Sequence, residues 1–318
     1  MTATMAVSVA PGEQNVMPRR SLDELQATVW RLSRQILEMT STAGSGHPSS
    51  SLSAIDIMTG LYFGGILRYN PTVSDWPRRD RFILSKGHAA PALYAVLAEA
   101  GYFSAAELNT LRQLGSRLEG HPNRRRLVGV EASTGSLGQG LSIGLGHALG
   151  ARLDNADYRV YVLLGDGEID EGQVWEAAMT AAKYKVDNLT AILDYNEYQQ
   201  TGSVNTVMPS LEPLIDKCEA CGWYVFEIDV HRMEAVVEAL QSVRTVTQQP
   251  QMIIAHTSKG RNLAPFLANR VNHKHGETLS EAELAAALAE LDEQKNWDLY
   301  SEVADELSPA LANGGLHR

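Results

Sequence analysis

Residues 159–202 read RVYVLLGDGEIDEGQVWEAAMTAAKYKVDNLTAILDYNEYQQTG, and this stretch decides the fold. It opens with an apolar run over residues 160–164, which is typical of a buried parallel strand. The turn Gly165-Asp166-Gly167 ends that run, a helical pattern extends from about 171 to 184, and a second apolar run over residues 189–193 leads into Asn196. The stretch therefore predicts a strand, a helix and a second strand parallel to the first.

Both polar residues of this stretch follow a predicted strand. Asp166 offers a carboxylate and Asn196, thirty residues later, a side-chain carbonyl. One crossover places them at neighbouring strand ends, the edge of an open parallel sheet where ligands bind. Mg²⁺ prefers oxygen ligands and often shares them with a phosphate, and the glycines leave backbone N–H groups open to an anion. The pattern indicates a metal and phosphate site.

Composition narrows the class of protein. Hydrophobic residues at 44% and charged residues at 20% are ordinary for a globular protein, and the net charge of −11 argues against nucleic acid or an anionic membrane as a partner. No apolar run approaches bilayer length, and residues 1–20 lack a signal-peptide pattern and are interpreted as a flexible arm. Two cysteines give no disulfide framework, which favours the cytoplasm. We interpret the CxxC pair, Cys218 and Cys221, as structural because a metal site needs more soft ligands.

Three histidines lie in glycine- or proline-bounded loops. They occur in Ser45-Gly46-His47-Pro48, Ser85-Lys86-Gly87-His88 and Gly120-His121-Pro122. His88 lies between a predicted strand at 81–84 and a helix starting near Pro91, and helix N-termini favour anions. His47 alone is typical of a surface loop, but three such signals within 122 residues are hard to explain as core histidines placed there by chance.

These motifs carry a resemblance. GDG followed by Asn196 resembles the thiamine-diphosphate motif, in which Asp166, Asn196 and the backbone carbonyl of Tyr198 hold a metal, Mg²⁺ or in its place Ca²⁺ or Mn²⁺. SGHP, SKGHA, EGHP and STGSLGQG, in that order before GDG, resemble the transketolase family over roughly residues 20–276. The first component of the 2-oxo-acid dehydrogenases shares the GDG–Asn pair but lacks the histidine series.

The resemblance implies roles for individual residues. His47 assists proton transfer, His121 binds the hydroxyls of the transferred two-carbon unit, and Glu171 links to the other active site across a dimer interface. His275 lies near diphosphate and substrate, with His273 as a competitor for that role. The remaining implied contacts are with the cofactor, through the diphosphate or the rings: His88, Gly135, Leu137 and Gly167.

Two rival signals accompany these motifs. Gly138, Gly140, Gly144 and Gly146 imitate a dinucleotide-binding fingerprint, but no apolar strand precedes them, so we expect them to let a helix at 137–153 pack closely. The trio Arg124 to Arg126 is either a solvated loop, which we favour, or an electropositive lip that attracts an anionic sugar.

The rest of the chain continues the alternation of strands and helices. We expect helices at 21–40, from near 51, at 91–100, 210–221, 233–247 and 280–291, and strands at 223–228 and 252–255. This pattern predicts an α/β fold with a mostly parallel sheet flanked by helices, the fold that the resemblance identifies as the diphosphate-binding domain. Residues 21–318 are expected to form that single domain, with a C-terminal helix and tail.

Length separates this chain from a full transketolase, which carries further pyrimidine-binding and C-terminal domains. Only residues 276–318 follow His275, too few for another domain. The resemblance therefore implies the N-terminal subunit of a split transketolase, which transfers a two-carbon ketol unit from a ketose or its phosphate to an aldose. A pyrimidine-binding subunit would complete a two-plus-two assembly. A 1-deoxy-xylulose phosphate synthase-like half and a non-catalytic cofactor-binding subunit are the alternatives.

Overall fold

The computed structural model describes residues 18–260 and 276–293. Its centre is a five-stranded sheet in the order β1-β2-β3-β5-β4, in which every pair of neighbours is parallel. The strands are β1 (Arg81–Leu84), β2 (Val160–Gly165), β3 (Leu189–Tyr195), β4 (Tyr224–Asp229) and β5 (Gln251–His256). The predicted fold class is confirmed.

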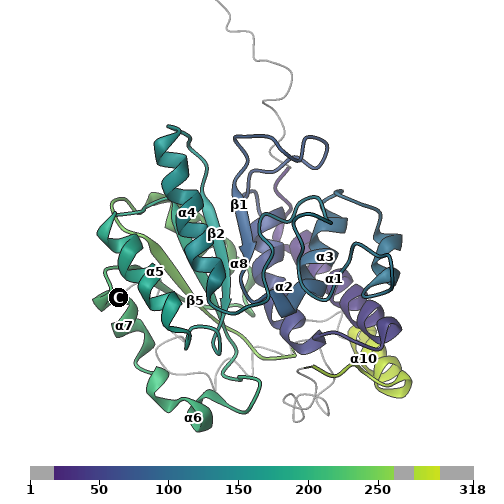
Figure 1. Ribbon diagram of the computed structural model, residues 1–318. Coiled ribbons are helices and arrows are strands. Elements are labelled where there is room, and N and C mark those ends of the chain that lie inside the picture. The colour runs from purple at the N-terminus through teal and green to yellow at the C-terminus, as the bar shows by residue number, and fades with distance from the viewer. Residues whose placement is uncertain (1–17, 261–275, 294–318) are drawn as a thin grey trace, which may run out of the picture.

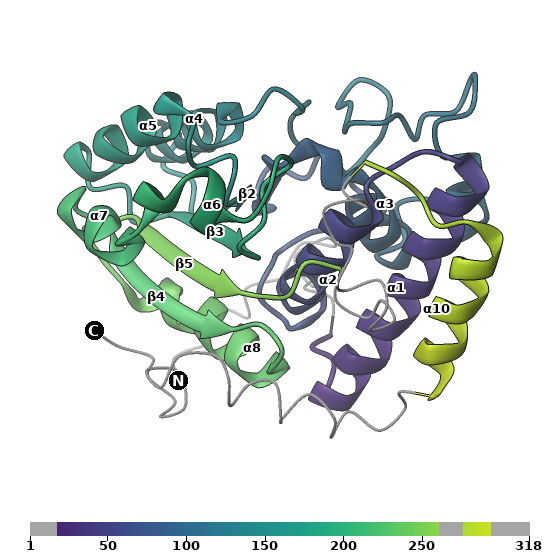
Figure 2. The same cartoon turned by 90° about the horizontal axis from the view of Figure 1, so that it is seen from below.

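Helices cover both faces of the sheet (Figures 1 and 2). Because side chains alternate along a strand, Tyr161 and Leu163 of β2 enter one apolar cluster while Val160, Val162 and Leu164 enter the other. The first cluster is covered by α1 (Leu22–Ala43), α2 (Pro48–Phe63), α3 (Ala90–Glu99), α8 (Met233–Ser242) and α10 (Glu281–Glu293). The second is covered by α4 (Gln139–Leu153), α5 (Gly172–Lys183) and α7 (Leu214–Ala220), and a single turn, α6 (Val204–Val207), follows β3.

Helix caps lie close to their predicted places. Ser21 and Glu24 form a reciprocal capping box at the start of α1, and Ser280 with Glu283 forms another at the start of α10. Helix α10 then lies along α1, although the two are far apart in the sequence (Figures 1 and 2). The Trp30 indole donates to the Leu291 carbonyl, and Arg34 pairs with Asp292 at 2.7 Å.

Two predicted helices are shorter than expected. The helix predicted at 210–221 is a 3₁₀ turn at Pro209–Leu211 followed by α7, because Pro213 lacks an N–H and holds Glu212 in an extended conformation. Helix α8 ends at Ser242 and tightens into a 3₁₀ turn at Val243–Thr245, where β-branched residues favour helix less.

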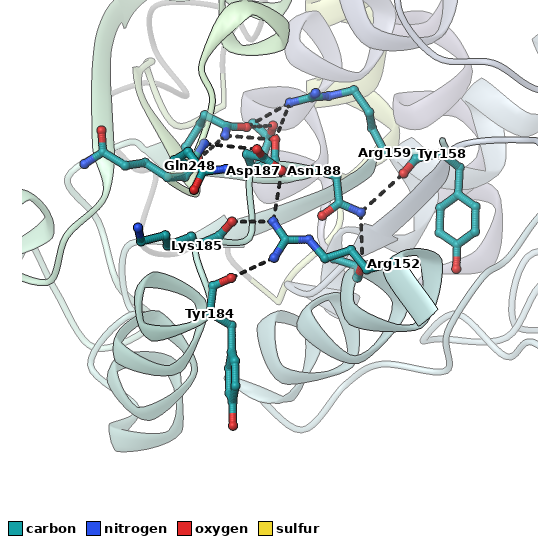
Figure 3. Close-up of polar contacts among 12 residues, drawn as sticks. Arg152, Tyr158, Arg159, Tyr184, Lys185, Asp187, Asn188 and Gln248 are labelled. Atoms are coloured by element: carbon teal, nitrogen blue, oxygen red, sulfur yellow. Dashed lines mark hydrogen bonds and ion pairs between the residues drawn. The ribbon is translucent and has the colours of Figure 1, made fainter. Parts of the chain in front are cut away.

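A polar network holds the edge of the sheet opposite the ligand edge (Figure 3). Arg152 of α4 donates to the carbonyls of Tyr184 and Lys185, which end α5, and pairs with Asp187 at 2.9 Å. The other oxygen of Asp187 accepts from the backbone N–H of Gln248 at 3.0 Å. These bonds tie α4, the segment that follows α5 and the residues just before β3 together at this edge.

No helix in the two described ranges is long and apolar enough to cross a membrane. The predicted arm falls almost wholly outside the described residues, as do the tail after residue 293 and residues 261–275.

The glycines of α4 provide a stability test. A Cβ on Gly144 would lie 2.4 Å from Cγ2 of the buried Val162, whereas a Cβ on Gly146 meets nothing within 4 Å. We expect Gly144→Ala to lower the free energy of unfolding by about 1–3 kcal/mol through overpacking. Gly146→Ala, the matched control, is expected to raise it by up to about 1 kcal/mol through helix propensity. Denaturant unfolding of the two variants measures both, and equal effects would contradict the close packing.

Candidate active site

A cavity of about 330 Å³ opens at the carboxyl edge of the sheet. The structure brings to it every predicted site residue in the described ranges except Glu171. They come from the loop before α2, the turn after β1, the long segment between α3 and α4, and the ends of β2 and β3. These residues are His47, His88, His121, Gly135, Leu137, Asp166, Gly167, Asn196 and Tyr198.

The predicted metal ligands lie side by side. Strands β2 and β3 pair with Gly165 opposite Asp194, so Asp166 and Asn196 follow neighbouring strand ends. The backbone N–H of Tyr198 lies 3.1 Å from Asp166 Oδ2 and 3.2 Å from Asn196 Oδ1, and donates to both. The second carboxylate oxygen, Asp166 Oδ1, accepts from the N–H of Gly167 at 2.8 Å. A carboxylate oxygen and an amide oxygen therefore converge at one point.

This set of atoms fits a hard cation. All three predicted ligands are oxygens, including the Tyr198 carbonyl, which accepts from Lys259 Nζ at 3.2 Å. Burial, together with the charge of Asp194, raises the pKa of Asp166 to about 7, so a cation bound beside the carboxylate would favour its ionised form. Within the described ranges no group of three His, Cys, Asp or Glu side chains could hold a metal ion, and the set around Asp166 has one carboxylate beside amide and carbonyl oxygens.

Two buried lysines also face this region. Lys86 of the SKGH motif is 2% exposed, and its Nζ lies 2.6 Å from Oδ2 of the fully buried Asp194. Burial lowers the pKa of Lys259 to about 8, although the charges of Asp166 and Asp194 oppose that shift. No local sequence pattern identifies Lys259, because only the folded chain brings it beside Tyr198.

The histidines form one wall of the cavity. His47 precedes the first turn of α2, and its ring centroid lies 5.3 Å from that of His88. Burial, then the charges of Arg112, His121, Lys86 and Lys259, lower the pKa of His47 to about 4. Partial burial and Arg112 also lower the pKa of His121. Both imidazoles are therefore neutral at neutral pH, and each can accept a hydrogen bond.

Arg112 connects the two histidine loops, and sequence reasoning missed it. Its guanidinium donates to Ser45 Oγ at 2.7 Å and to the Gly120 carbonyl at 3.3 Å. These residues lie just before His47 and His121, so one side chain fixes the spacing of both loops.

Glu168 was also missed. It is 2% exposed and lines the cavity, and it accepts from Ser85 Oγ at 2.5 Å and from the N–H groups of Gly138 and Gly165 at 2.9 and 3.1 Å. Ser85 in turn accepts from the N–H of Gly140, where a Cβ would lie 2.3 Å from the serine oxygen. The glycines at 138, 140 and 144 are thus explained by close packing, as predicted, whereas the same prediction is wrong for Gly146, where a Cβ meets nothing within 4 Å. A carboxylate in the tight turn after a strand was the available signal for Glu168.

Comparison with known proteins agrees with this geometry. The family described as transketolase, thiamine diphosphate binding domain, matches residues 27–317. The chain belongs to the transketolase family.

Three relatives show which part of a transketolase this chain resembles. A protein of Clostridium sp. (strain MSTE9) named as a 6-deoxy-6-sulfo-D-fructose transketolase subunit is 42% identical over 85% of this chain and 96% of its own length. A protein of Phocaeicola vulgatus named as an apulose-4-phosphate transketolase subunit is 39% identical over 83% of this chain and 94% of its own length. The crystal structure of transketolase from Campylobacter jejuni superposes with a TM-score of 0.80 at 31% identity, covering 86% of this chain and 43% of that one. The transketolase fold and the N-terminal, thiamine-diphosphate-binding part are therefore confirmed.

Several predicted transketolase residues lie elsewhere or outside the described ranges. Glu171 is exposed and does not line the cavity, and it occupies the N-cap position of α5 without a side-chain capping hydrogen bond. Its role at a dimer interface stays a prediction. His273 and His275 are outside the described residues. A Cβ on the next described residue, Gly276, would lie 3.8 Å from His47 Nε2, so the chain is beside the cavity at that point.

The arginine trio and the cysteine pair support the simpler interpretations. Arg126 pairs with Glu119 at 3.7 Å, and none of the three arginines is among the described residues that line the cavity. Cys218 and Cys221 are not joined by a disulfide, and burial raises the pKa of the Cys218 thiol to about 12. A thiol of that kind is inert, as expected for a structural cysteine.

The protonation of His47 is testable by NMR. We expect the imidazole to titrate with a midpoint of about 4, against an ordinary value of 6.5. Since the unfolded chain binds this proton near pH 6.5 and the folded chain only near pH 4, the contribution of His47 to stability is full above pH 6.5 and falls as the pH drops towards 4. Arg112→Met is expected to raise the midpoint by removing a nearby positive charge.

Arg117→Met serves as the control for this titration, because Arg117 pairs with Glu107 and is not among the charges acting on His47. A wild-type midpoint near 6.5, or equal midpoints in the two arginine variants, would contradict the assignment of charges around His47.

Proposed function

We propose that this chain is the cofactor-binding subunit of a split transketolase, transferring a two-carbon ketol unit from an anionic ketose to an aldose. The observation that carries the proposal is the convergence of Asp166, Asn196 and the loop histidines on one cavity. The match to nearly the whole length of two proteins named as transketolase subunits supports the split arrangement. Their names specify a sulfonated and a phosphorylated sugar, which supports an anionic ketose.

In this proposal, the present chain holds the metal ion and the diphosphate of the cofactor. Asp166 Oδ2, Asn196 Oδ1 and the Tyr198 carbonyl would hold Mg²⁺, and His88 with the N–H of Gly167 would hold diphosphate oxygens. Lys86 and Lys259 lie within the electrostatic range of Asp166 and offset its charge and that of Asp194. Bound thiamine diphosphate supplies the nucleophilic carbon that takes up the two-carbon unit.

The histidines would serve the sugar. His47 is held neutral by burial, so its ring can accept a hydrogen bond from a substrate hydroxyl, and from that position it would assist proton transfer. His121 has an exposed ring at the cavity and would orient the hydroxyls of the two-carbon unit. Arg112 fixes both loops, so the two rings stay at a constant spacing during transfer.

The first prediction concerns Asp166. Asp166→Ala removes the charged ligand and is expected to weaken Mg²⁺-dependent binding of thiamine diphosphate at least about 100-fold, since removal of outer partners of metal ligands already costs about 10–100-fold. Calorimetric titration of the protein assembled with its partner measures this affinity. Asp157→Ala is the control, because the Asp157 side chain is 63% exposed and pairs with Arg68 far from the metal ligands. Undiminished affinity in Asp166→Ala would remove Asp166 from the metal site.

The second prediction concerns the partner. We expect no ketol transfer by this chain alone, because the groups that would hold the cofactor's pyrimidine come from another domain, and activity on mixing with a pyrimidine-binding subunit. Size-exclusion chromatography with a donor-cleavage assay tests both points, and a two-plus-two complex is the expected assembly. Asp166→Ala is expected to assemble without turning over. Full turnover by the isolated chain would overturn the split-enzyme proposal.

A further inference from the structure

Asp194, near the end of β3, is fully buried and fully hydrogen bonded, yet it lies behind the cavity and not in its lining. Its Oδ2 accepts from Lys86 Nζ and from Ser53 Oγ, both at 2.6 Å. Its Oδ1 accepts from Asn196 Nδ2 at 3.3 Å. Residues from β3, from α2 and from the turn after β1 therefore hold this one carboxylate.

The two partners of Asn196 fix which way its amide faces. The Tyr198 N–H can only donate, so the atom 3.2 Å from it must be the amide oxygen. The Asp194 carboxylate can only accept, so the atom facing it must be the amide nitrogen. Both constraints agree, and the amide oxygen lies on the side of Asp166 Oδ2, with which it shares the Tyr198 N–H.

Lys86 makes this arrangement specific. A buried carboxylate needs a paired cation, and Lys86 supplies it at Oδ2. Because Lys86 and Ser53 both bind Oδ2, Oδ1 is left for the Asn196 amide. Because of this ion pair, the Asp194 atom that faces Asn196 is Oδ1, which can only accept a hydrogen bond.

We propose that Asp194 is a positioning residue that locks the Asn196 amide with its oxygen towards the metal. This inference rests on the proposed function, since it assigns the metal to Asp166, Asn196 and Tyr198. In Asp194→Asn, Lys86 draws the new amide oxygen to itself, so an NH₂ group faces Asn196. The Asn196 amide then turns its oxygen to that NH₂ group and presents nitrogen to the metal, which cannot bind it.

A double-mutant cycle on metal affinity tests this coupling. The probe is Mn²⁺ with thiamine diphosphate, titrated into the full-length chain assembled with its partner subunit and followed by electron paramagnetic resonance. Asp194→Asn is expected to weaken Mn²⁺ binding by about 10–100-fold, the usual effect of an outer-shell partner. Asn196→Ala is expected to weaken it too, and Asp194→Asn added to Asn196→Ala is expected to change nothing further.

Asp187→Asn is the matched control. Asp187 lies just before β3, where it pairs with Arg152 and accepts from Gln248, at the edge of the sheet opposite the metal (Figure 3). Asp187→Asn is expected to lower the melting temperature and to leave the affinity for Mn²⁺ unchanged. If Asp194→Asn fails to fold because Lys86 is left unpaired, the cycle is repeated in a Lys86→Met background, with Lys86→Met alone as the reference for the lost positive charge. In that background Ser53 Oγ still donates to the oxygen at the Oδ2 position, so the introduced NH₂ group still faces Asn196 and the same pattern of losses is expected.

The outcomes separate the two proposals. No Mn²⁺ binding by the wild-type assembly would overturn the proposed metal site. The positioning role is overturned if the wild type binds Mn²⁺ and Asp194→Asn does not weaken that binding. It is also overturned if Asp194→Asn weakens Mn²⁺ binding equally with and without Asn196. Both results leave the proposed function intact.

Discussion

The parallel hydrogen bonding between β2 and β3 is the constraint on which the site depends. Its register sets Gly165 opposite Asp194, and parallel strands must end at the same edge of the sheet. Asp166 and Asn196 therefore meet around one backbone N–H. Strand β1, paired to the other side of β2, brings the SKGH turn to the same edge, so Lys86 reaches Asp194 across the sheet.

Charge balance explains why so many ionisable groups can be buried together. Asp166 and Asp194 raise the free energy of the apo site through desolvation and mutual repulsion, and Lys86 and Lys259 offset part of it. Asp194 is fully paired, whereas Asp166 accepts only backbone N–H groups within the described part of the chain and keeps a raised pKa. The two carboxylates therefore serve different purposes. One organises the protein, and the other is left for a cation.

Close backbone packing supports the same edge from the other face of the sheet. Helix α4 approaches β1 and β2 so closely that Ser85 and Val162 occupy the space of side chains at Gly140 and Gly144. Glu168 then binds the N–H groups at both the start of α4 and the end of β2. The turns that carry His88, Gly135 and Asp166 are thus fastened to one another before any ligand arrives.

The sequence by itself determined the five strands, the parallel sheet and most of the cavity. Apolar runs ending in glycine, and histidines bounded by glycine or proline, are local signals whose physical cause lies in the same few residues. The spacing between Asp166 and Asn196 was also enough to predict that they lie at neighbouring strand ends, because a single crossover leaves little freedom in where the second strand ends. Cap residues Ser21 and Ser280 were visible for the same reason.

Only the tertiary structure decided the roles of Arg112, Glu168, Asp194 and Lys259. Their partners are distant in the chain, as with Lys86 and Asp194 or Arg112 and Ser45, so no local pattern distinguishes them from solvated surface charges. The pKa values of His47 and Asp166 were hidden in the same way, because burial is a property of the packed chain and not of a sequence window. The sequence determined which residues reach the sheet edge, and the packing decided which of them are charged, oriented or inert there.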